Sequence, residues 1–257
     1  TVILVVIYHV FYMFNGQVTS GVIGPFTPVQ YQDVVQYFVY PWFMLLLFVI
    51  SGMSARFYLN GHSDKEFLKS RTTKLLVPST IGLFVFWWIL GYYNMMIGGA
   101  FENMSAVPKP LLYVIMAVSG TGALWYIQLL WVVSLFLLFI RKIEKDRLYG
   151  LCEKANLPVL LCMTPVIWGA AQILNTPVIV VYRFGIYGVG FLLGYFIFSH
   201  DAVMERLEKW WLPLTLAALG LGIGFVFTFW GAPYAEHQVL DTFLCNVYAW
   251  IATLAVL

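Results

Sequence analysis

Charged residues are scarce in this chain of 257 residues. Asp, Glu, Lys and Arg make up 10% of it, whereas 61% of the residues are hydrophobic and 18% are aromatic. Soluble domains usually carry about 25% charged residues, so the composition excludes intrinsic disorder and argues strongly against a soluble globule. The 14 basic residues barely exceed the 12 acidic ones, and so small a net charge gives no indication of a nucleic-acid partner.

Cysteine and the common catalytic motifs are equally scarce. The three cysteines, Cys152, Cys162 and Cys245, are odd in number, widely spaced and lack a CxxC pair. This pattern speaks against a disulfide framework and against a zinc site. HExxH, GxSxG, Walker-loop and dinucleotide-binding sequences do not occur. No metal site is expected.

Long apolar runs occupy most of the chain. About 20 apolar residues cross a bilayer as a helix, whereas an open sheet would leave unpaired backbone groups in lipid. The Asn-Thr-Pro turn at 175–177 splits one long region into two helices. We expect an all-α, polytopic transmembrane helix bundle with about eight helical segments, drawn from the runs 1–14, 34–55, 75–101, 123–141, 155–182, 184–200, 210–235 and 242–257.

Both ends of the sequence lie inside apolar runs. Residues 1–14 and 242–257 are too short to cross about 30 Å of hydrocarbon, and the first run lacks an initiating Met. It also lacks the basic start and small-residue cleavage site of a signal peptide. We therefore expect a single transmembrane domain over residues 1–257, with both terminal helices trimmed.

Basic residues gather on alternate loops, which predicts the orientation in the membrane. The loops after the second, fourth and sixth segments carry 12 of the 14 Lys and Arg residues. By the positive-inside rule these loops face the cytoplasm. The residues are Arg56, Lys65, Lys69, Arg71, Lys74, Arg141, Lys142, Lys145, Arg147, Lys154, Arg206 and Lys209.

His9 stands inside the first apolar run. An ionisable group at membrane depth is costly and usually faces the protein interior or a wet cavity. Histidine also exchanges protons near neutral pH, so it is a natural base for a hydroxyl group. The alternative is a neutral histidine that is hydrogen-bonded between helices.

Two short sequences on the predicted cytoplasmic side are also candidate functional sites. Ser51 and Gly52, near the end of the second segment, permit close backbone approach and a local kink. Arg71 and Lys74 precede Pro78 at the entry to the third segment. They either hold the phosphates of a cytosolic ligand or simply anchor the loop by the positive-inside effect.

Four residues mark the opposite side. Trp125 and Tyr126 are most simply interfacial anchors, and Gln128 is a polar residue that orders a substrate or a neighbouring helix. Arg183 is the only basic residue embedded between long apolar runs. It is expected either to pair with one of the acidic residues Asp33, Glu102, Glu236 and Asp241 or to face an acidic acceptor.

Two GxxxG pairs, Gly190 with Gly194 and Gly220 with Gly224, predict close helix packing. The remaining histidines, His62, His200 and His237, are expected in solvated loops or at interfaces. No inverted repeat is visible, and the acidic residues lie in loops or at helix ends, which counts against a transporter.

Together these pieces resemble the integral-membrane acyltransferase family 3, which includes O-acetyltransferases of bacterial surface polysaccharides and succinyltransferases of periplasmic glucans. The matching motifs lie between His9 and Ile140. Departures from the family pattern are Lys74, where a second arginine is common, and Ala123, where a histidine is common. The motifs are residues 6–9 (Val-Ile-Tyr-His), 47–52 (Leu-Phe-Val-Ile-Ser-Gly), 71–78 (Arg-Thr-Thr-Lys-Leu-Leu-Val-Pro) and 124–127 (Leu-Trp-Tyr-Ile).

The resemblance implies an O-acyltransferase of a bacterial cytoplasmic membrane that moves acetyl or succinyl from cytosolic acyl-CoA to a hydroxyl of an extracytoplasmic carbohydrate or related cell-envelope acceptor. Acyl-CoA is then a co-substrate, and no resident cofactor is implied. His9 would be the catalytic base. Arg71, Lys74, Ser51 and Gly52 would bind the donor, whereas Trp125, Tyr126, Gln128 and Arg183 would lie on the acceptor side.

Competing interpretations place the chain among non-enzymatic membrane proteins. It would then be an exporter or channel for glycans or small molecules, a membrane sensing domain fused to another domain, or a membrane module whose partner domain was removed. The resemblance favours the enzyme, whereas the residues alone leave the two classes close to even.

Overall fold

The computed structural model describes residues 2–12, 31, 33–104, 106–177 and 181–257. The chain divides into two compact units. The first unit combines Thr1–Asn60 with Ile143–Leu257, and the second is Gly61–Lys142. The expectation of one domain over residues 1–257 stays a prediction.

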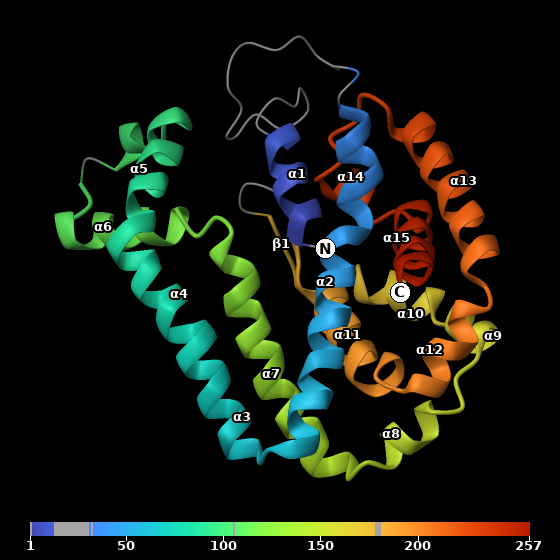
Figure 1. Ribbon diagram of the computed structural model, residues 1–257. Coiled ribbons are helices and arrows are strands. Elements are labelled where there is room, and N and C mark those ends of the chain that lie inside the picture. The colour runs from blue at the N-terminus through green and yellow to red at the C-terminus, as the bar shows by residue number, and fades with distance from the viewer. Residues whose placement is uncertain (1, 13–30, 32, 105, 178–180) are drawn as a thin grey trace. The chain divides into compact units, whose positions relative to one another are not determined.

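The first unit is built almost entirely of helices, with one two-stranded hairpin in its described part (Figure 1). Its elements are α1 (Val2–Tyr12), α2 (Asp33–Gly61), α8 (Arg147–Cys152), α9 (Leu157–Cys162), α10 (Thr164–Ala170), β1 (Asn175–Pro177), β2 (Val181–Arg183), α11 (Phe184–Leu193), the π-helix η4 (Gly194–Phe198), α12 (Asp201–Glu208), α13 (Trp211–Phe229), α14 (His237–Leu240) and α15 (Phe243–Val256).

The second unit is entirely helical in its described part. Its elements are α3 (Asp64–Arg71), the π-helices η1 (Thr72–Leu76) and η2 (Leu83–Trp87), α4 (Val77–Gly82), α5 (Trp88–Ile97), the 3-10 helix η3 (Ala100–Asn103), α6 (Lys109–Ser119) and α7 (Leu124–Glu144).

In the described part of the chain, four helices are long and apolar enough to cross a membrane: Asp33–Gly61, Asp64–Ile97, Leu124–Glu144 and Trp211–Phe229. A bent pair, Phe184–Phe198 with Asp201–Glu208, would be a fifth span if the two helices are counted as one. This architecture confirms the prediction of an all-α helical bundle. Shorter apolar helices include α1 and α15, near the two ends of the described chain, and also Lys109–Ser119 and Leu157–Ala170.

The third segment begins earlier than the apolar pattern predicts. The helical run starts at Asp64, not near residue 75. Ser63 caps it, because its hydroxyl accepts from the Glu66 backbone N–H at 3.3 Å and the Glu66 carboxylate accepts from the Ser63 N–H at 2.8 Å. This reciprocal capping box fixes the start of the helix at Asp64, which hydropathy alone does not predict.

The fifth segment is shorter than expected. The predicted split of this region into two helices around residues 175–177 is confirmed, although these residues form a strand and not a simple turn. The helix ends at Ala170, and residues 175–177 form β1, which pairs antiparallel with β2. Leu174 adopts a φ of 54°, a left-handed conformation that reverses the chain ahead of the strand. Pairing with β2 then satisfies backbone groups that a simple turn would leave open.

Glycines bring α2 and α11 into backbone contact. A Cβ on Gly52 would lie 1.9 Å from the backbone oxygen of Phe191, and one on Gly194 would lie 2.0 Å from the backbone oxygen of Val49. The expected close packing at Gly190 and Gly194 is thereby confirmed. The same expectation is wrong for Gly220 and Gly224, since a Cβ at either position would meet no described atom within 4 Å.

Candidate functional site

His9 lies on α1 with its ring exposed. Its Nδ1 is 2.7 Å from the backbone oxygen of Val5, one turn earlier. Because a carbonyl oxygen can only accept, Nδ1 carries the proton in this hydrogen bond. In the neutral ring the lone pair therefore resides on Nε2. The helix itself thus holds the imidazole in the tautomer that a general base requires.

The ring of His9 adjoins a group of five tyrosines, here named the tyrosine cluster. The His9 ring centroid lies 5.2 Å from that of Tyr8, and 6.4 Å from that of Tyr12. Rings in the cluster contact one another with centroids 5.2–6.0 Å apart. Its members are Tyr8, Tyr12, Tyr37, Tyr40 and Tyr234.

Buried polar groups hold the tyrosine cluster in place. The Tyr234 hydroxyl donates to Gln36 Oε1 at 3.3 Å, and Gln36 Nε2 donates to the Tyr8 backbone oxygen at 3.0 Å. Burial raises the pKa of Tyr234 well above its ordinary value, so its hydroxyl stays protonated and able to donate. Tyr37 donates to the Ala232 oxygen at 2.5 Å. These bonds tie α1 and α2 to the segment before α14.

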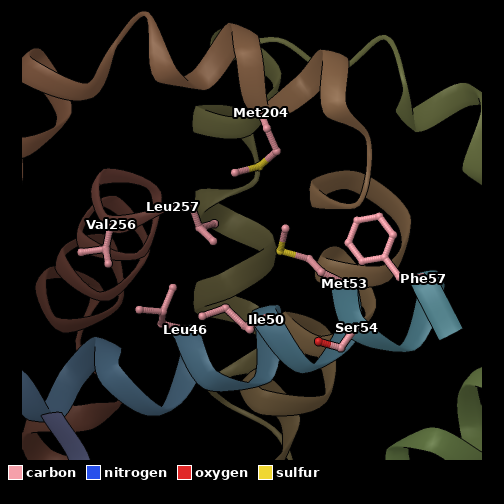
Figure 2. A pocket seen from close by; sticks show the side chains of 8 residues that line it. All are labelled: Leu46, Ile50, Met53, Ser54, Phe57, Met204, Val256 and Leu257. Atoms are coloured by element: carbon pink, nitrogen blue, oxygen red, sulfur yellow. The ribbon is translucent and has the colours of Figure 1, made fainter. Parts of the chain in front are cut away.

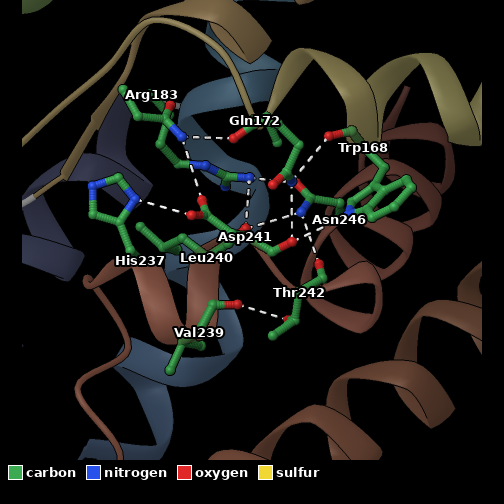
Figure 3. Close-up of polar contacts among 11 residues, drawn as sticks. Trp168, Gln172, Arg183, His237, Val239, Leu240, Asp241, Thr242 and Asn246 are labelled. Atoms are coloured by element: carbon green, nitrogen blue, oxygen red, sulfur yellow. Dashed lines mark hydrogen bonds and ion pairs between the residues drawn. The ribbon is translucent and has the colours of Figure 1, made fainter.

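Arg183 closes β2 and is completely buried. Figure 3 shows its guanidinium directed at α14 and α15, where Nη2 donates to Asn246 Oδ1 and to the Leu240 backbone oxygen. Of the two expected alternatives, an ion pair with an acidic residue is absent from the part of the chain that is described, where the structure records an amide partner, and an acidic acceptor stays a prediction. Tyr40 interacts electrostatically with Arg183. The tyrosine cluster therefore lies between the regions of His9 and Arg183.

Ser51 is half-buried and Gly52 is buried on α2, where Gly52 faces the backbone of α11. Successive helical residues are rotated by about 100°, so neighbours of Gly52 in the sequence point away from α11. On that opposite side of α2 the structure has a pocket of about 340 Å³ (Figure 2). It is mainly apolar and is lined by Leu46, Ile50, Met53, Ser54, Phe57, Met204, Val256 and Leu257.

Arg71 and Lys74 lie at a helical irregularity in the second unit. Pro78 cannot donate to the carbonyl of Lys74 and would crowd it in a regular helix. The chain instead forms the π-helix η1, in which the Val77 N–H donates to the Thr72 oxygen. Such π segments are frequent at functional sites. Lys74 is exposed, whereas the Arg71 guanidinium carbon lies 5.0 Å from the Phe67 ring centroid.

The remaining predicted residues begin α7. Gly122 has a φ of 46°, a conformation that glycine tolerates, and the helix starts two residues later at Leu124. The predicted start near Ala123 is therefore confirmed. Trp125 and Tyr126 are half-buried, with ring centroids 6.4 Å apart, and Gln128 is also half-buried.

The structure thus divides the predicted site residues between the two units. His9 and Arg183 both adjoin the tyrosine cluster in the first unit, and Ser51 and Gly52 lie farther along α2 in the same unit. The second unit holds Arg71, Lys74, Trp125, Tyr126 and Gln128.

A second polar group in the first unit was not predicted from the sequence. Arg56, counted among the loop cations, lies on α2 and donates to Asp146 Oδ1 at 2.7 Å and to the Tyr195 hydroxyl at 3.0 Å. Its guanidinium carbon also lies 3.5 Å from the Tyr149 ring centroid. The face of Tyr149 is further stacked with His200, with centroids 3.8 Å apart. Only the basic charge of Arg56 was visible in the sequence, since its partners are far along the chain.

Replacing Arg56 with methionine is expected to lower the stability of the purified protein by about 1–3 kcal/mol, because a cation–π contact and two charged hydrogen bonds are lost. Asp146→Asn is the matched control. The Asp146 side chain is 57% exposed, so the control should cost under about 1 kcal/mol. Thermal unfolding in detergent checks both, and equal losses in the two variants would contradict this assignment of Arg56.

One histidine differs from expectation. His200 is buried rather than solvated, and its Nε2 donates to the Tyr149 backbone oxygen at 3.0 Å. His237 lies 3.0 Å from Asp241 Oδ2 through Nδ1, so a carboxylate orients it. His62 is exposed, as predicted.

Metal-ligating side chains do not gather in the described ranges: no group of three or more His, Cys, Asp or Glu side chains there could hold a metal ion. Cys152 is half-buried, and burial followed by the charge of Glu144 raises the pKa of its thiol. A raised pKa keeps that thiol protonated at neutral pH and poorly nucleophilic.

Comparison with known proteins gives one family match. A family model described as an acyltransferase domain matches residues 1–257. No curated protein and no solved structure matches the chain.

Proposed function

The chain belongs to the integral-membrane acyltransferase 3 family and is a membrane acyltransferase, and from that premise we propose that it transfers an acetyl or succinyl group from cytosolic acyl-CoA to a hydroxyl of an extracytoplasmic carbohydrate or related cell-envelope acceptor. The proposal places the protein in a bacterial cytoplasmic membrane that several of its helices cross. The apolar helices long enough to span a bilayer support this placement.

The geometry of His9 carries the proposal. Its Nδ1–H is engaged by Val5, so Nε2 of the exposed ring is the nitrogen that accepts a proton. As Nε2 takes the proton of the acceptor hydroxyl, the hydroxyl oxygen attacks the thioester carbonyl and forms the ester bond. The carbon–sulfur bond then breaks, and the proton passes from His9 to the departing CoA thiolate. Atoms and charges balance without a cofactor.

The remaining predicted residues receive roles on the two sides of this step. Arg71 and Lys74 bind the phosphates of acyl-CoA, because cationic groups beside an irregular helical turn suit a charged headgroup. Ser51 and Gly52 form part of the donor passage along α2. Trp125, Tyr126, Gln128 and Arg183 contact the acceptor, and their aromatic and polar side chains suit a sugar.

The test uses the full-length protein in inside-out membrane vesicles, which present the cytoplasmic face to the medium. Radiolabelled acetyl-CoA or succinyl-CoA is added outside, and label is followed into hydroxyl-bearing acceptors in the lumen. We expect one CoA thiol released for each ester formed. Right-side-out vesicles are the control and should show no transfer. CoA release without ester, or no transfer from either donor, would overturn the proposal.

A further inference from the structure

Arg183 is a fully buried cation whose donors are only partly satisfied. Its Nη2 donates to Asn246 Oδ1 and to the Leu240 backbone oxygen. Among the residues that the structure describes, Nε and Nη1 have no hydrogen-bond partner. A guanidinium has five N–H donors, so with Nη2 engaged twice, three buried N–H groups remain unpaired.

The neighbouring carboxylate makes no direct ion pair with Arg183. Asp241 lies in the same network, but its Oδ2 pairs with His237 at 3.0 Å and its Oδ1 accepts from Asn175 at 3.3 Å. No ion pair joins Arg183 within the described ranges. An arginine cannot shed its proton in a protein, and an uncompensated buried charge costs several kcal/mol. An anion from outside the chain would remove that cost.

A second unsatisfied group faces the same way. Asn175 lies directly opposite Arg183 in the β1–β2 ladder, and opposed residues project from the same face of a sheet. The Asn175 amide nitrogen donates to the Ala171 oxygen at 2.6 Å, whereas its Oδ1 is buried without a donor. An acceptor of this kind calls for a hydroxyl or another neutral donor.

We propose that Arg183 and Asn175 form a binding site for an acidic sugar, in which Arg183 holds the carboxylate and Asn175 accepts from a neighbouring hydroxyl. The site deepens the proposed function, on which it rests, by making the acceptor a polyhydroxylated carboxylic acid. Tyr40 and Tyr187 interact electrostatically with Arg183. Phenol hydroxyls and ring faces are suited to the remaining surface of a sugar.

A carboxylate can reach Arg183 from two sources. It belongs either to the acceptor, as proposed, or to a dicarboxylic acyl group such as succinyl. The first experiment measures binding of D-glucuronate and of D-glucose to the purified full-length protein by calorimetry in detergent. Charge-assisted hydrogen bonds correspond to about a 10- to 100-fold difference in affinity. We expect wild type to favour glucuronate by that factor and Arg183→Gln to lose the preference.

Arg183→Lys and Arg206→Gln complete the comparison. Lysine retains the charge but not the planar fork, so part of the preference should survive. Arg206 donates to the backbone oxygens of Glu153 and Ala155, remote in sequence from the hairpin, and its variant should behave as wild type. If Arg183→Gln fails to fold, wild type and Arg183→Lys decide the matter, since equal binding of glucuronate and glucose by wild type would overturn the site.

Transfer assays separate the two sources. Methyl glucuronoside and methyl glucoside are compared as acceptors with acetyl-CoA, and then acetyl-CoA and succinyl-CoA are compared with the better acceptor. A preference for the acidic acceptor that depends on Arg183 supports the proposal, whereas a preference confined to succinyl-CoA overturns the acceptor assignment. Absence of all transfer would refute the proposed function, while the binding measurement would still test the site.

Discussion

Replacing His9 with alanine is expected to lower the rate of acyl transfer by about 100- to 10,000-fold, the range that a positioned general base contributes. The Nε2 of His9 accepts the hydroxyl proton and later returns it to the leaving thiolate. Alanine has no group that can do either. The effect should fall on kcat, with the KM for acyl-CoA little changed, because His9 acts on the acceptor hydroxyl rather than on the donor headgroup.

The same variant is expected to fold normally. The His9 ring is exposed, and its side-chain hydrogen bond runs to Val5 in its own helix. Loss of that bond leaves a backbone carbonyl that still participates in the helix. Thermal unfolding within a few degrees of wild type is therefore expected, which separates a chemical defect from a folding defect.

His62→Ala is the matched control for His9→Ala, because His62 is also exposed and lies between α2 and α3. It should transfer acyl groups at the wild-type rate. His9→Gln adds a further distinction, since glutamine retains a hydrogen-bonding side chain but cannot accept and release a proton. Full activity in His9→Ala at normal expression would exclude His9 as the base.

The sequence predicts the helices well where a single apolar run decides the outcome. Residues 34–55 become most of α2, and the run near 123–141 becomes most of α7. The sequence does not predict the end of a helix where contacts with residues far along the chain determine it. The apolar character of 155–182 cannot show that the helix ends at Ala170, because the hairpin that follows depends on pairing between β1 and β2.

In the candidate site, too, some residues could be predicted from the sequence and others could not. His9 stands out because an ionisable group interrupts an apolar run, and the Ser51–Gly52 pair indicates close backbone approach, which the contact with α11 confirms. The tyrosine cluster does not stand out, because its members come from α1, α2 and the segment before α14. Taken singly, tyrosines in a membrane protein resemble interfacial anchors. Only their contacts in the fold identify them as one group.

Gly52→Ala is expected to have the largest effect on folding. Its Cβ would lie 1.9 Å from the backbone oxygen of Phe191 and 2.9 Å from the backbone nitrogen of Tyr195. Both obstacles are backbone atoms, so relief requires α11 to move away from α2. Overpacking at side chains costs about 1–3 kcal/mol, and a clash with backbone should reach or exceed the upper end of that range.

Gly220→Ala is the control for Gly52→Ala, because Gly220 lies inside α13 and a Cβ there would meet nothing within 4 Å. Alanine favours a helix over glycine by about 1 kcal/mol, so this variant should be as stable as wild type or slightly more so. Thermal unfolding and yield from membranes measure both. Equal unfolding temperatures for the two variants would contradict the close packing of α2 on α11.

Kinetics of the surviving Gly52→Ala protein then separate packing from donor binding. If Gly52 only permits contact between α2 and α11, the folded fraction should retain the wild-type KM for acyl-CoA and lose activity in proportion to its yield. If Gly52 also forms part of the donor passage, the KM should rise in the folded fraction. The first result leaves Arg71 and Lys74 as the donor-binding residues, and the second places the passage along α2, beside the helix contact that Gly52 makes possible.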